Sequence, residues 1–299
     1  MNTQEILQKI VEITRDCSCT MKLVNKNRTQ FSFYPTPLED GIQEELQEFI
    51  KSTLTTILKE NSLESFNPTG KPDHTIEYIA TEDVSSYADL KNCYDDSNNV
   101  VSSLDSLGNI NAYLIHIKSS DGQSNLKIFR KYSKSKSLSK GFRLIRKNNI
   151  FDKLTDNIFI IDENIDFIVL NDEKIIIVNR YAFELITNYR DNYIENLSTA
   201  LNEIENSDLI DNIELFKEHC FNSMRIAKQF TRAMNNNSIT TIKNEPEKVA
   251  QAITAAQLPI SFVNNKFIYE SKEQLSILVA LLSDEYARTL IRGDIAQVR

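Results

Sequence analysis

The segment IDFIVLNDEKIIIVN, residues 165–179, limits the possible folds more than any other part of the chain. Two short apolar runs flank a polar bend, Asn171 to Lys174. Short apolar runs bounded by turn-forming residues are typical of β-strands, and Asn and Asp favour tight turns between them. The segment therefore predicts a β-hairpin, and the rest of the chain must supply partners for its strands.

Three earlier segments show the same strand character. NAYLIHIK (111–118), LKIFRKYS (126–133) and GFRLIRK (141–147) alternate apolar with polar or basic residues. Because side chains alternate along a strand, Lys127, Phe129 and Lys131 should point one way and Ile128, Arg130 and Tyr132 the other. HTIEYIA (74–80) and the pair MKLVN and TQFSFYP, joined across Asn25 to Arg28, predict further strands.

Helical spacing of apolar residues appears on both sides of these strands. The expected helices cover residues 3–16, 37–59, 180–189, 193–206, 213–234, 246–258 and 272–282. The second should bury Ile42, Leu46, Phe49, Ile50, Leu54, Ile57 and Leu58. The chain is predicted to be α+β, with an N-terminal helix and strand region, a central antiparallel sheet and a helical C-terminal half.

Local signals mark several ends. Thr36-Pro37-Leu38-Glu39 and Ser271-Lys272-Glu273-Gln274 have the spacing of capping boxes, Asn179 is placed to cap a helix, and Asn264-Asn265 predicts a hairpin turn. Residues 82–109 are rich in Asp, Ser and Asn and indicate a linker or long surface loop. We therefore expect two regions, 1–107 and 108–299.

The charge of the chain is partitioned. The formal net charge is −8, with 42 acidic residues among 299. Residues 122–151 nevertheless hold nine Lys or Arg and no acid, whereas the segments on either side are both acidic. Two interpretations stay open: a strand pair with a solvated basic face, or a surface selected against negative charge.

Nucleic-acid binding is the leading functional hypothesis. Lys, Arg and Ser side chains contact phosphates without reading sequence, and an acidic remainder would confine DNA to one face. The expected contacts are Lys127, Arg130, Lys131, Lys134, Lys136, Lys140, Arg143, Arg146 and Lys147, with YSKSKSLSKG as a hairpin tip or loop. Arg225, Lys228 and Arg232, which share a helical face with Lys217, could extend this surface or could be an ordinary solvated face.

Two other functional classes are kept. Asp166, Asp172 and Lys174 could serve a metal-dependent nuclease, although a structural turn explains them better. The basic stretch could instead dock an acidic partner protein or, less well, an anionic membrane.

Enzyme chemistry otherwise finds little support. The three histidines are isolated, and the common motifs of hydrolases, nucleotide-binding loops and zinc proteases do not occur. We therefore expect a non-enzymatic protein without catalytic, metal or cofactor site. The four scattered cysteines fit a reducing cytosol, and no apolar run approaches the ~20 residues needed to span a bilayer.

From residue 141 onward the chain resembles the KwaB-like family of the bacterial Kiwa anti-phage system. The family pattern of an Asp-Phe-Ile strand, a turn, an Ile-rich strand ending in Asn-Lys or Asn-Arg, and a Phe-containing helix is similar to Asp166-Phe167-Ile168, Ile175 to Val178, Asn179-Arg180 and Phe183-Glu184. The ending KFIYESKEQLSILVALLSDEYARTLIRGDIAQV (266–298) is similar too, with Leu282-Ser283-Asp284-Glu285-Tyr286 where the family has Leu-Asp-Asp-Tyr. The likeness covers about residues 108–299.

The resemblance implies a role in antiviral defence. Proteins of this type look like DNA-binding effectors that form dimers and associate with a four-pass membrane sensor, KwaA. It implies DNA, a KwaA-like protein and a second copy of the chain as partners, and a cytoplasmic location with recruitment to the inner face of the membrane. No family motif fixes individual DNA-binding residues.

Overall fold

The computed structural model describes residues 3–28, 30–95, 110–132, 144–147, 150–153, 159–235, 237–288 and 295–297. The chain divides into two compact units. Unit 1 comprises Met1–Ser65 and His74–Asn188, and unit 2 comprises Phe66–Asp73 and Tyr189–Arg299. A short segment from the first quarter of the sequence therefore belongs with the C-terminal part.

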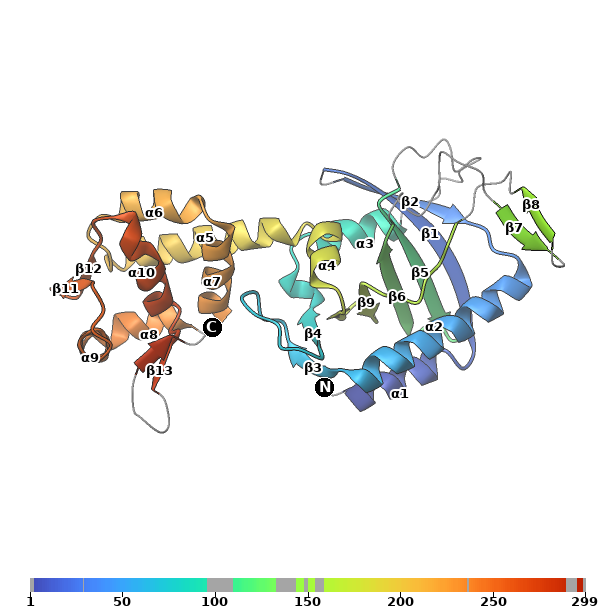
Figure 1. The fold of residues 1–299 in the computed structure, drawn as a ribbon, viewed down its shortest axis with the longest axis horizontal. Helices are drawn as coiled ribbons and strands as arrows, with labels where there is room; N and C mark the ends of the chain where they lie inside the picture. The colour runs from blue at the N-terminus through green and yellow to red at the C-terminus, as the bar shows by residue number, and fades with distance from the viewer. Residues whose placement is uncertain are drawn as a thin grey trace. The chain divides into compact units, whose positions relative to one another are not determined.

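Unit 1 is built on an eight-stranded sheet in the order β2-β1-β5-β6-β9-β10-β4-β3 (Figure 1). Its strands are β1 (Cys17–Asn27), β2 (Gln30–Thr36), β3 (Ser62–Ser65), β4 (Thr75–Ala80), β5 (Ala112–Ser119), β6 (Asn125–Lys131), β9 (Phe167–Leu170) and β10 (Lys174–Ile177). Neighbouring strands pair antiparallel, except that β3 and β4 at one edge are parallel. The predicted α+β class is confirmed, and the sheet is mixed because of this edge pair.

Helices α1 (Thr3–Ile13) and α2 (Asp40–Glu60) cover one face of the sheet (Figure 1). Ile6, Ile10 and Ile13 of α1 are buried, as their spacing predicted. The expected start of α2 is wrong: Thr36 ends strand β2, so the helix begins at Asp40. Ile42 and Phe49, expected inside, are 47% and 37% exposed.

The opposite face carries α3 (Tyr87–Asp95) and α4 (Arg180–Ile186). The side chain of Asn179 accepts a hydrogen bond from the backbone N–H of Ala182, so the predicted cap of α4 is confirmed. Residues 81–95, expected mainly as loop, form a 3₁₀ turn (Thr81–Asp83) and α3. Tyr87, Leu90 and Tyr94 are buried, and this burial stabilises α3 despite its polar composition. Residues 96–109 lie outside the described ranges.

The hairpin predicted from residues 165–179 is present as β9 and β10. Asn171 and Asp172 at the bend have φ of 53° and 57°, and the N–H of Glu173 donates to the carbonyl of Leu170. Two consecutive left-handed residues are what a tight hairpin turn requires, and Asn and Asp adopt this conformation more readily than other non-glycine residues.

Strands β7 (Leu144–Lys147) and β8 (Ile150–Lys153) pair as a separate two-stranded sheet. The strand expected over 141–147 is therefore confirmed for its second half. It does not pair with β6 in the described residues.

Unit 2 is mainly helical. It contains α5 (Tyr189–Asn206), α6 (Ile213–Phe221), α7 (Met224–Asn235), α8 (Ser238–Asn244), α9 (Pro246–Ala255), the hairpin β11 (Ser261–Val263) and β12 (Lys266–Ile268), the 3₁₀ turn Lys272–Gln274, α10 (Leu275–Leu282), and the pair β13 (Tyr286–Arg288) and β14 (Ile295–Gln297). The predicted turn at Asn264-Asn265 and the capping box at Ser271 are confirmed.

The single helix expected over 213–234 is wrong. Asn222 and Ser223 interrupt it, and the N–H of Ser223 donates to the carbonyl of Cys220 three residues back. Short polar side chains such as these compete with helical backbone bonds, which favours a helix end at this point.

The boundary expected between residues 107 and 108 does not separate the compact units. Strand β1 pairs with β5 from Cys17 opposite Ser119 to Val24 opposite Ala112. Because one sheet contains strands from both sides of that position, residues 96–109 connect two parts of the same unit. The units divide between Asn188 and Tyr189 instead.

Candidate anion-binding site

Lys127, the first of the expected phosphate ligands, is held inside unit 1. Its side chain is 4% exposed, and Nζ donates to Oδ1 of Asp172 at 2.6 Å. Tyr87 donates to the same oxygen at 2.6 Å. Burial opposes ionisation of Asp172, but the hydrogen bonds from Lys127 and Tyr87 outweigh it and lower its pKa. Lys127 thus neutralises a carboxylate of the protein.

His116 lies beside this pair on the same sheet face. Its Nδ1 is hydrogen-bonded to the hydroxyl of Tyr94. Burial, reinforced by the charge of Lys127, lowers the pKa of His116 to about 4. Its Nε2 is buried without a hydrogen-bond partner among the described residues. The ring is therefore neutral at pH 7.

Arg130 is engaged by two carboxylates on the other sheet face. Its guanidinium forms paired bonds of 3.0 and 3.1 Å with Asp162 and a third of 2.9 Å with Asp166. Asp166 is fully buried and also accepts from the side chain of Asn179 at 2.9 Å. The alternation predicted along residues 127–132 is therefore correct. It places Lys127 and Arg130 on opposite faces, each against a carboxylate of the protein.

The carboxylates of the nuclease hypothesis are not brought together. Asp166 and Asp172 lie at opposite ends of β9, whose four residues span about 13 Å. Lys174 lies with Nζ 5.8 Å from the ring centroid of Tyr78. The described part of the chain contains no group of three His, Cys, Asp or Glu side chains that could hold a metal ion.

Lys131 differs from Lys127 and Arg130 in its surroundings. Its Nζ lies 4.7 Å from the ring centroid of Tyr181, which is 67% exposed. Side chains are described for three cations of residues 122–151, namely Lys127, Arg130 and Lys131. Among the described residues, Lys131 is the one of the three that has no carboxylate partner. Lys134, Lys136, Lys140 and Arg143 lie outside the described residues, and Arg146 and Lys147 belong to β7, whose backbone alone is described.

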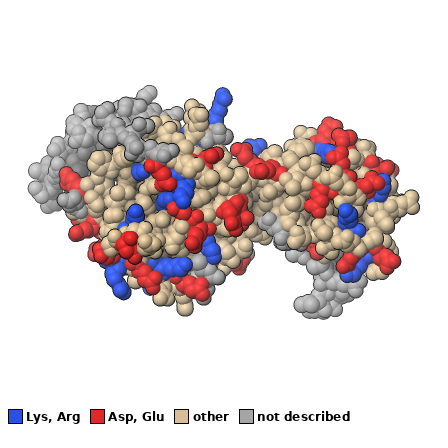
Figure 2. All heavy atoms as spheres, turned by 180° about the vertical axis from the view of Figure 1, so that it is seen from behind, with Lys and Arg blue, Asp and Glu red and all other residues tan. Residues whose placement is uncertain are grey.

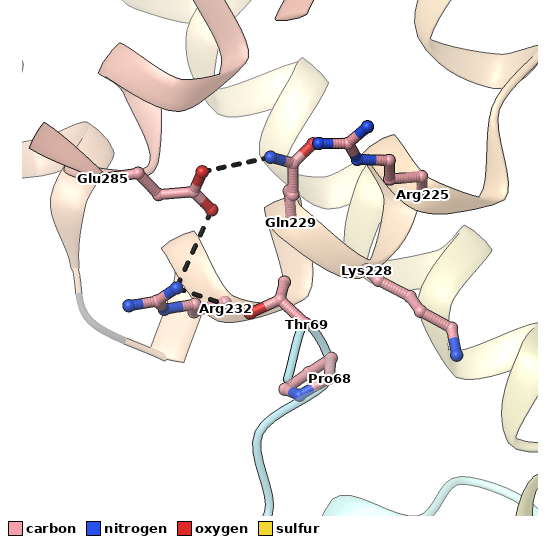
Figure 3. Close-up of a pocket in the computed structure, with 7 residues that line it drawn as sticks. All are labelled: Pro68, Thr69, Arg225, Lys228, Gln229, Arg232 and Glu285. Carbon is pink, nitrogen blue, oxygen red and sulfur yellow. Dashed lines mark hydrogen bonds and ion pairs between the residues drawn. The ribbon is translucent and has the colours of Figure 1, made fainter. Parts of the chain in front are cut away.

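The second expected cationic group lines a pocket in unit 2 (Figure 3). Arg225, Lys228 and Arg232, on one side of α7, line a space of about 230 Å³. Their spacing of three and four residues places them on one helical face, as predicted. The opposite side of α7 is apolar and buried, through Ile226, Ala227, Phe230 and Ala233. The amphipathic character of α7 therefore fixes where the three cations point.

A buried carboxylate faces these cations. Glu285 is 4% exposed, accepts from Nε2 of Gln229 at 3.1 Å and lies 3.8 Å from Nη1 of Arg232 (Figure 3). Its position follows from the end of α10. Asp284 is left-handed with φ of 52°, and the N–H groups of Asp284 and Glu285 donate to the carbonyls of Leu281 and Ala280. These two bonds define a Schellman motif, which turns the chain so that Glu285 reaches the pocket.

The remaining wall comes from residues 66–73. Phe66 packs edge-on against Tyr189, with ring centroids 5.3 Å apart, and Oδ1 of Asn67 accepts from both the N–H and the hydroxyl of Thr69. Nη1 of Arg232 in turn donates to the hydroxyl oxygen of Thr69 at 3.4 Å. The wall is thus held by an aromatic contact and a local turn.

Sequence reasoning missed Thr69, Gln229 and Glu285. The Asn67-Pro68-Thr69-Gly70 sequence signals a turn but not its partner, because α7 lies more than 150 residues later. Gln229 follows Arg225 by four residues on the same helical face, a signal that was available. Lys217, grouped with the α7 cations, lies instead in α6 and pairs with Glu205 at 2.8 Å.

Elsewhere the described surface carries both signs of charge. On the face shown in Figure 2, Lys and Arg spheres are interspersed with Asp and Glu spheres in each unit. Among the two described pockets, the one on α7 has more cations than carboxylates, with three against one. It is the best-defined candidate for binding an anion.

Comparison with known protein families gives one match. A family model described as Kiwa protein KwaB-like matches residues 107–292, more than half of the sequence. The chain belongs to the Kiwa protein KwaB-like family. Membership connects it with Kiwa anti-phage defence and with partner proteins of that system such as KwaA. No curated protein and no solved structure matches the chain.

The KwaB-like match contains α7 and Glu285 but not the wall formed by residues 66–73. It also contains the whole acid-free stretch. Within the described ranges, no helix combines the length and the apolar character needed to cross a membrane.

Proposed function

We propose that the chain is a DNA-binding effector of a Kiwa-like defence system. It would hold phage DNA through phosphate contacts and so block replication or transcription. The observation that carries this proposal is the run of seven Lys or Arg between Lys131 and Lys147 with no acid among them. Family membership supplies the biological setting.

The proposed DNA contacts do not include Lys127 and Arg130. Lys127 is paired with Asp172, and Arg130 is paired with Asp162 and Asp166. The α7 cations are treated separately, because they surround a recessed pocket that also holds a buried carboxylate. The contacts proposed for DNA are Lys131, Lys134, Lys136, Lys140, Arg143, Arg146 and Lys147.

Electrostatics support a localised interaction. Each phosphate neutralised by Lys or Arg releases condensed counterions, which favours binding at low salt. Outside residues 122–151 the chain carries 42 acidic and 25 basic residues, so the remainder repels a polyanion. Binding without base contacts would be largely independent of DNA sequence.

We also propose two protein partners. The chain acts as a homodimer and is recruited to the inner face of the membrane by a KwaA-like protein, as the resemblance to KwaB-like proteins implies. Sedimentation of the purified chain and co-purification with the KwaA-like protein test these two statements. A monomer over the micromolar range, or no co-purification from intact membranes, would contradict them respectively.

A salt titration tests DNA binding. We expect the affinity for a blunt duplex without terminal phosphates to fall with salt between about 50 and 200 mM, with a log–log slope near −0.9 per phosphate contact. Changing Lys131, Lys134 and Lys136 together to Glu should weaken binding strongly and make the slope shallower.

The matched control is the triple change of Lys9, Lys51 and Lys59 to Glu. These exposed lysines lie on α1 and α2, and the change in net charge is identical. It should reduce affinity far less. Equal losses in both triple variants would show that net charge alone governs binding, and a flat salt response would reject phosphate contacts. If the chain does not bind DNA but binds an acidic protein, the basic stretch is a protein-docking surface.

A further inference from the structure

The α7 pocket has features that a duplex backbone does not match. Its cations line a space of about 230 Å³, which is also lined by Pro68, Thr69 and the buried carboxylate of Glu285. Each backbone phosphate is a diester with a single negative charge, so it would match only one of the two excess positive charges of the pocket. A surface for duplex DNA presents its cations outward and without such a neighbour.

We propose that this pocket binds a small phosphate monoester that also carries a hydroxyl group, the chemistry of a nucleoside monophosphate. The proposal does not depend on DNA binding by residues 131–147. It assigns the phosphate to Arg225, Lys228 and Arg232, and the hydroxyl to Glu285.

The charge of the pocket favours a monoester over a diester. Three cations against one carboxylate leave a formal excess of two positive charges. A phosphate monoester carries about −1.5 to −2 at pH 7, because its second pKa is near 6. Its three terminal oxygens can also accept from several donors at once, as phosphate groups do from clustered Arg and Lys.

The donors have capacity for such a ligand. Both contacts that fix Arg232, to Thr69 and to Glu285, use Nη1, and the Glu285 contact of 3.8 Å is longer than a hydrogen bond. Arg225 is exposed at the first turn of α7, where the helix dipole adds positive potential. Arg232 is therefore oriented by the protein, and its Nη2 and Nε take no part in these two contacts.

Glu285 explains why the ligand should carry a hydroxyl. One of its oxygens accepts from Gln229, and the carboxylate borders the space that the cations line (Figure 3). An ionised carboxylate only accepts hydrogen bonds, so the ligand group next to it must be a donor. A sugar hydroxyl adjacent to the phosphate meets this requirement.

The volume sets the size of the bound group. About 230 Å³ corresponds to roughly eight water molecules at ~30 Å³ each, below the usual range for drug-sized ligands. A phosphate and its sugar fill this space, and a base would lie at the mouth.

Isothermal titration of the full chain with adenosine 5′-monophosphate tests the proposal. We expect adenosine, which lacks the phosphate, not to bind. Cyclic 3′,5′-adenosine monophosphate, a diester, should bind about tenfold more weakly or worse, because it has one charge fewer to meet the charge-assisted donors. Affinity for the monophosphate should fall between about pH 7.5 and 5.5 as its phosphate takes up a proton.

Substitutions assign the residues. Arg232→Gln and Lys228→Gln should each weaken binding about tenfold, since each removes a charge-assisted contact. Glu285→Gln should weaken binding of the monophosphate, because it removes the acceptor for the hydroxyl group. It should strengthen binding of inorganic phosphate, because it removes a negative charge. This opposite response separates recognition from a loss of folding. Lys217→Gln on α6, outside the pocket, is the charge-matched control and should leave both affinities unchanged.

Three outcomes would overturn the proposal: no binding of the monophosphate at millimolar concentration, equal affinity for the cyclic diester, or affinities unchanged in the α7 variants. Failure here would leave duplex binding by residues 131–147 untouched, because that assay uses DNA without terminal phosphates. Loss of duplex binding in the Lys131, Lys134 and Lys136 variant should conversely leave the monophosphate affinity as it was.

Discussion

Lys127 supplies the charge that holds the β9–β10 turn against strand β6. Its Nζ is 2.6 Å from Asp172, and Tyr94 lies over the ammonium with its ring centroid 4.8 Å away. Removing one member of a buried pair leaves the other charge uncompensated, which commonly costs 3–5 kcal/mol. Asp172 would keep Tyr87 and Lys91, so the loss should be smaller here.

We predict that Lys127→Met lowers the free energy of unfolding by about 2 kcal/mol, measured by urea denaturation. Asp172→Asn in the same chain should recover part of the loss, because the carboxylate no longer needs a counter-charge. Lys118→Met, on an exposed position of the adjacent strand, is the control and should change stability by less than about 0.5 kcal/mol. No difference between Lys127→Met and this control would mean that the pair contributes nothing to stability.

The pKa of His116 gives unit 1 a defined response to acid. The folded pKa is about 4, whereas an unfolded histidine titrates near 6.5, so between these values the unfolded chain binds more protons. Stability should be full above about pH 6.5 and should fall towards pH 4, by up to about 1.4 kcal/mol per pH unit from this group.

Urea denaturation as a function of pH measures this effect. His116→Gln should flatten the curve between about pH 6.5 and 4, and His74→Gln, at an exposed position, should leave it unchanged. A wild-type curve that does not fall in this interval would show that the ring is not buried as a neutral group.

For single residues, the sequence indicates to which face of the sheet a side chain points, but not which residue it pairs with. The alternation along residues 127–132 correctly separates Lys127 from Arg130. Their counter-ions, Asp172 and Asp162, lie 45 and 32 residues further along the chain. A local pattern contains no information about which distant carboxylate folds back, so Lys127 and Arg130, both paired with carboxylates of the protein, were expected as phosphate ligands.

Among the elements, the end of α10 decides the geometry of the pocket. Asp284 occupies the left-handed position of the Schellman motif. This conformation costs an L-residue roughly 1–2 kcal/mol, less for Asp and Asn, and costs the achiral glycine nothing. The same turn delivers Glu285 to α7.

We predict that Asp284→Val lowers the free energy of unfolding by about 1–2 kcal/mol, because a β-branched side chain is strained at φ of 52°. Asp284→Asn should be nearly neutral, and Asp284→Gly neutral or slightly stabilising. Thermal melts of the three variants provide the measurement. If Val and Asn behaved alike, the left-handed conformation would not be required there.

Elements were predicted best where both the pattern and its ends are local. The hairpins at Asn171 and Asn264, the cap at Asn179 and the box at Ser271 follow from turn and cap residues alone. The box at Thr36 failed because pairing with β1 extends β2 through Thr36, so a tertiary contact overrides the local signal. The break between α6 and α7 was missed because apolar spacing continues across Asn222 and Ser223.

For the whole molecule, the order of strand and helix patterns indicated the α+β class but not the division into units. The polar composition of residues 82–109 predicted a linker or a long surface loop, and a segment of either kind can join two domains or two strands of one sheet. Pairing of β1 with β5 settles the matter in favour of one sheet, and only long-range strand pairing carries that information. Arg225, Lys228 and Arg232 of α7 were likewise predicted to form an open surface. They line a pocket instead, and this could not be predicted because Thr69, on the opposite wall, is distant in the sequence.

The chain passes between its units at Ser65, Asp73 and Asn188, so neither unit is encoded by an uninterrupted stretch of sequence. During synthesis, residues 66–73 leave the ribosome more than a hundred residues before the helices on which they pack. A gene fragment starting at Tyr189 would encode those helices without Phe66 and Thr69, and the ring of Tyr189 would lose its edge-on contact with Phe66. Shortened versions intended for biochemical work should therefore graft residues 66–73 back through a linker.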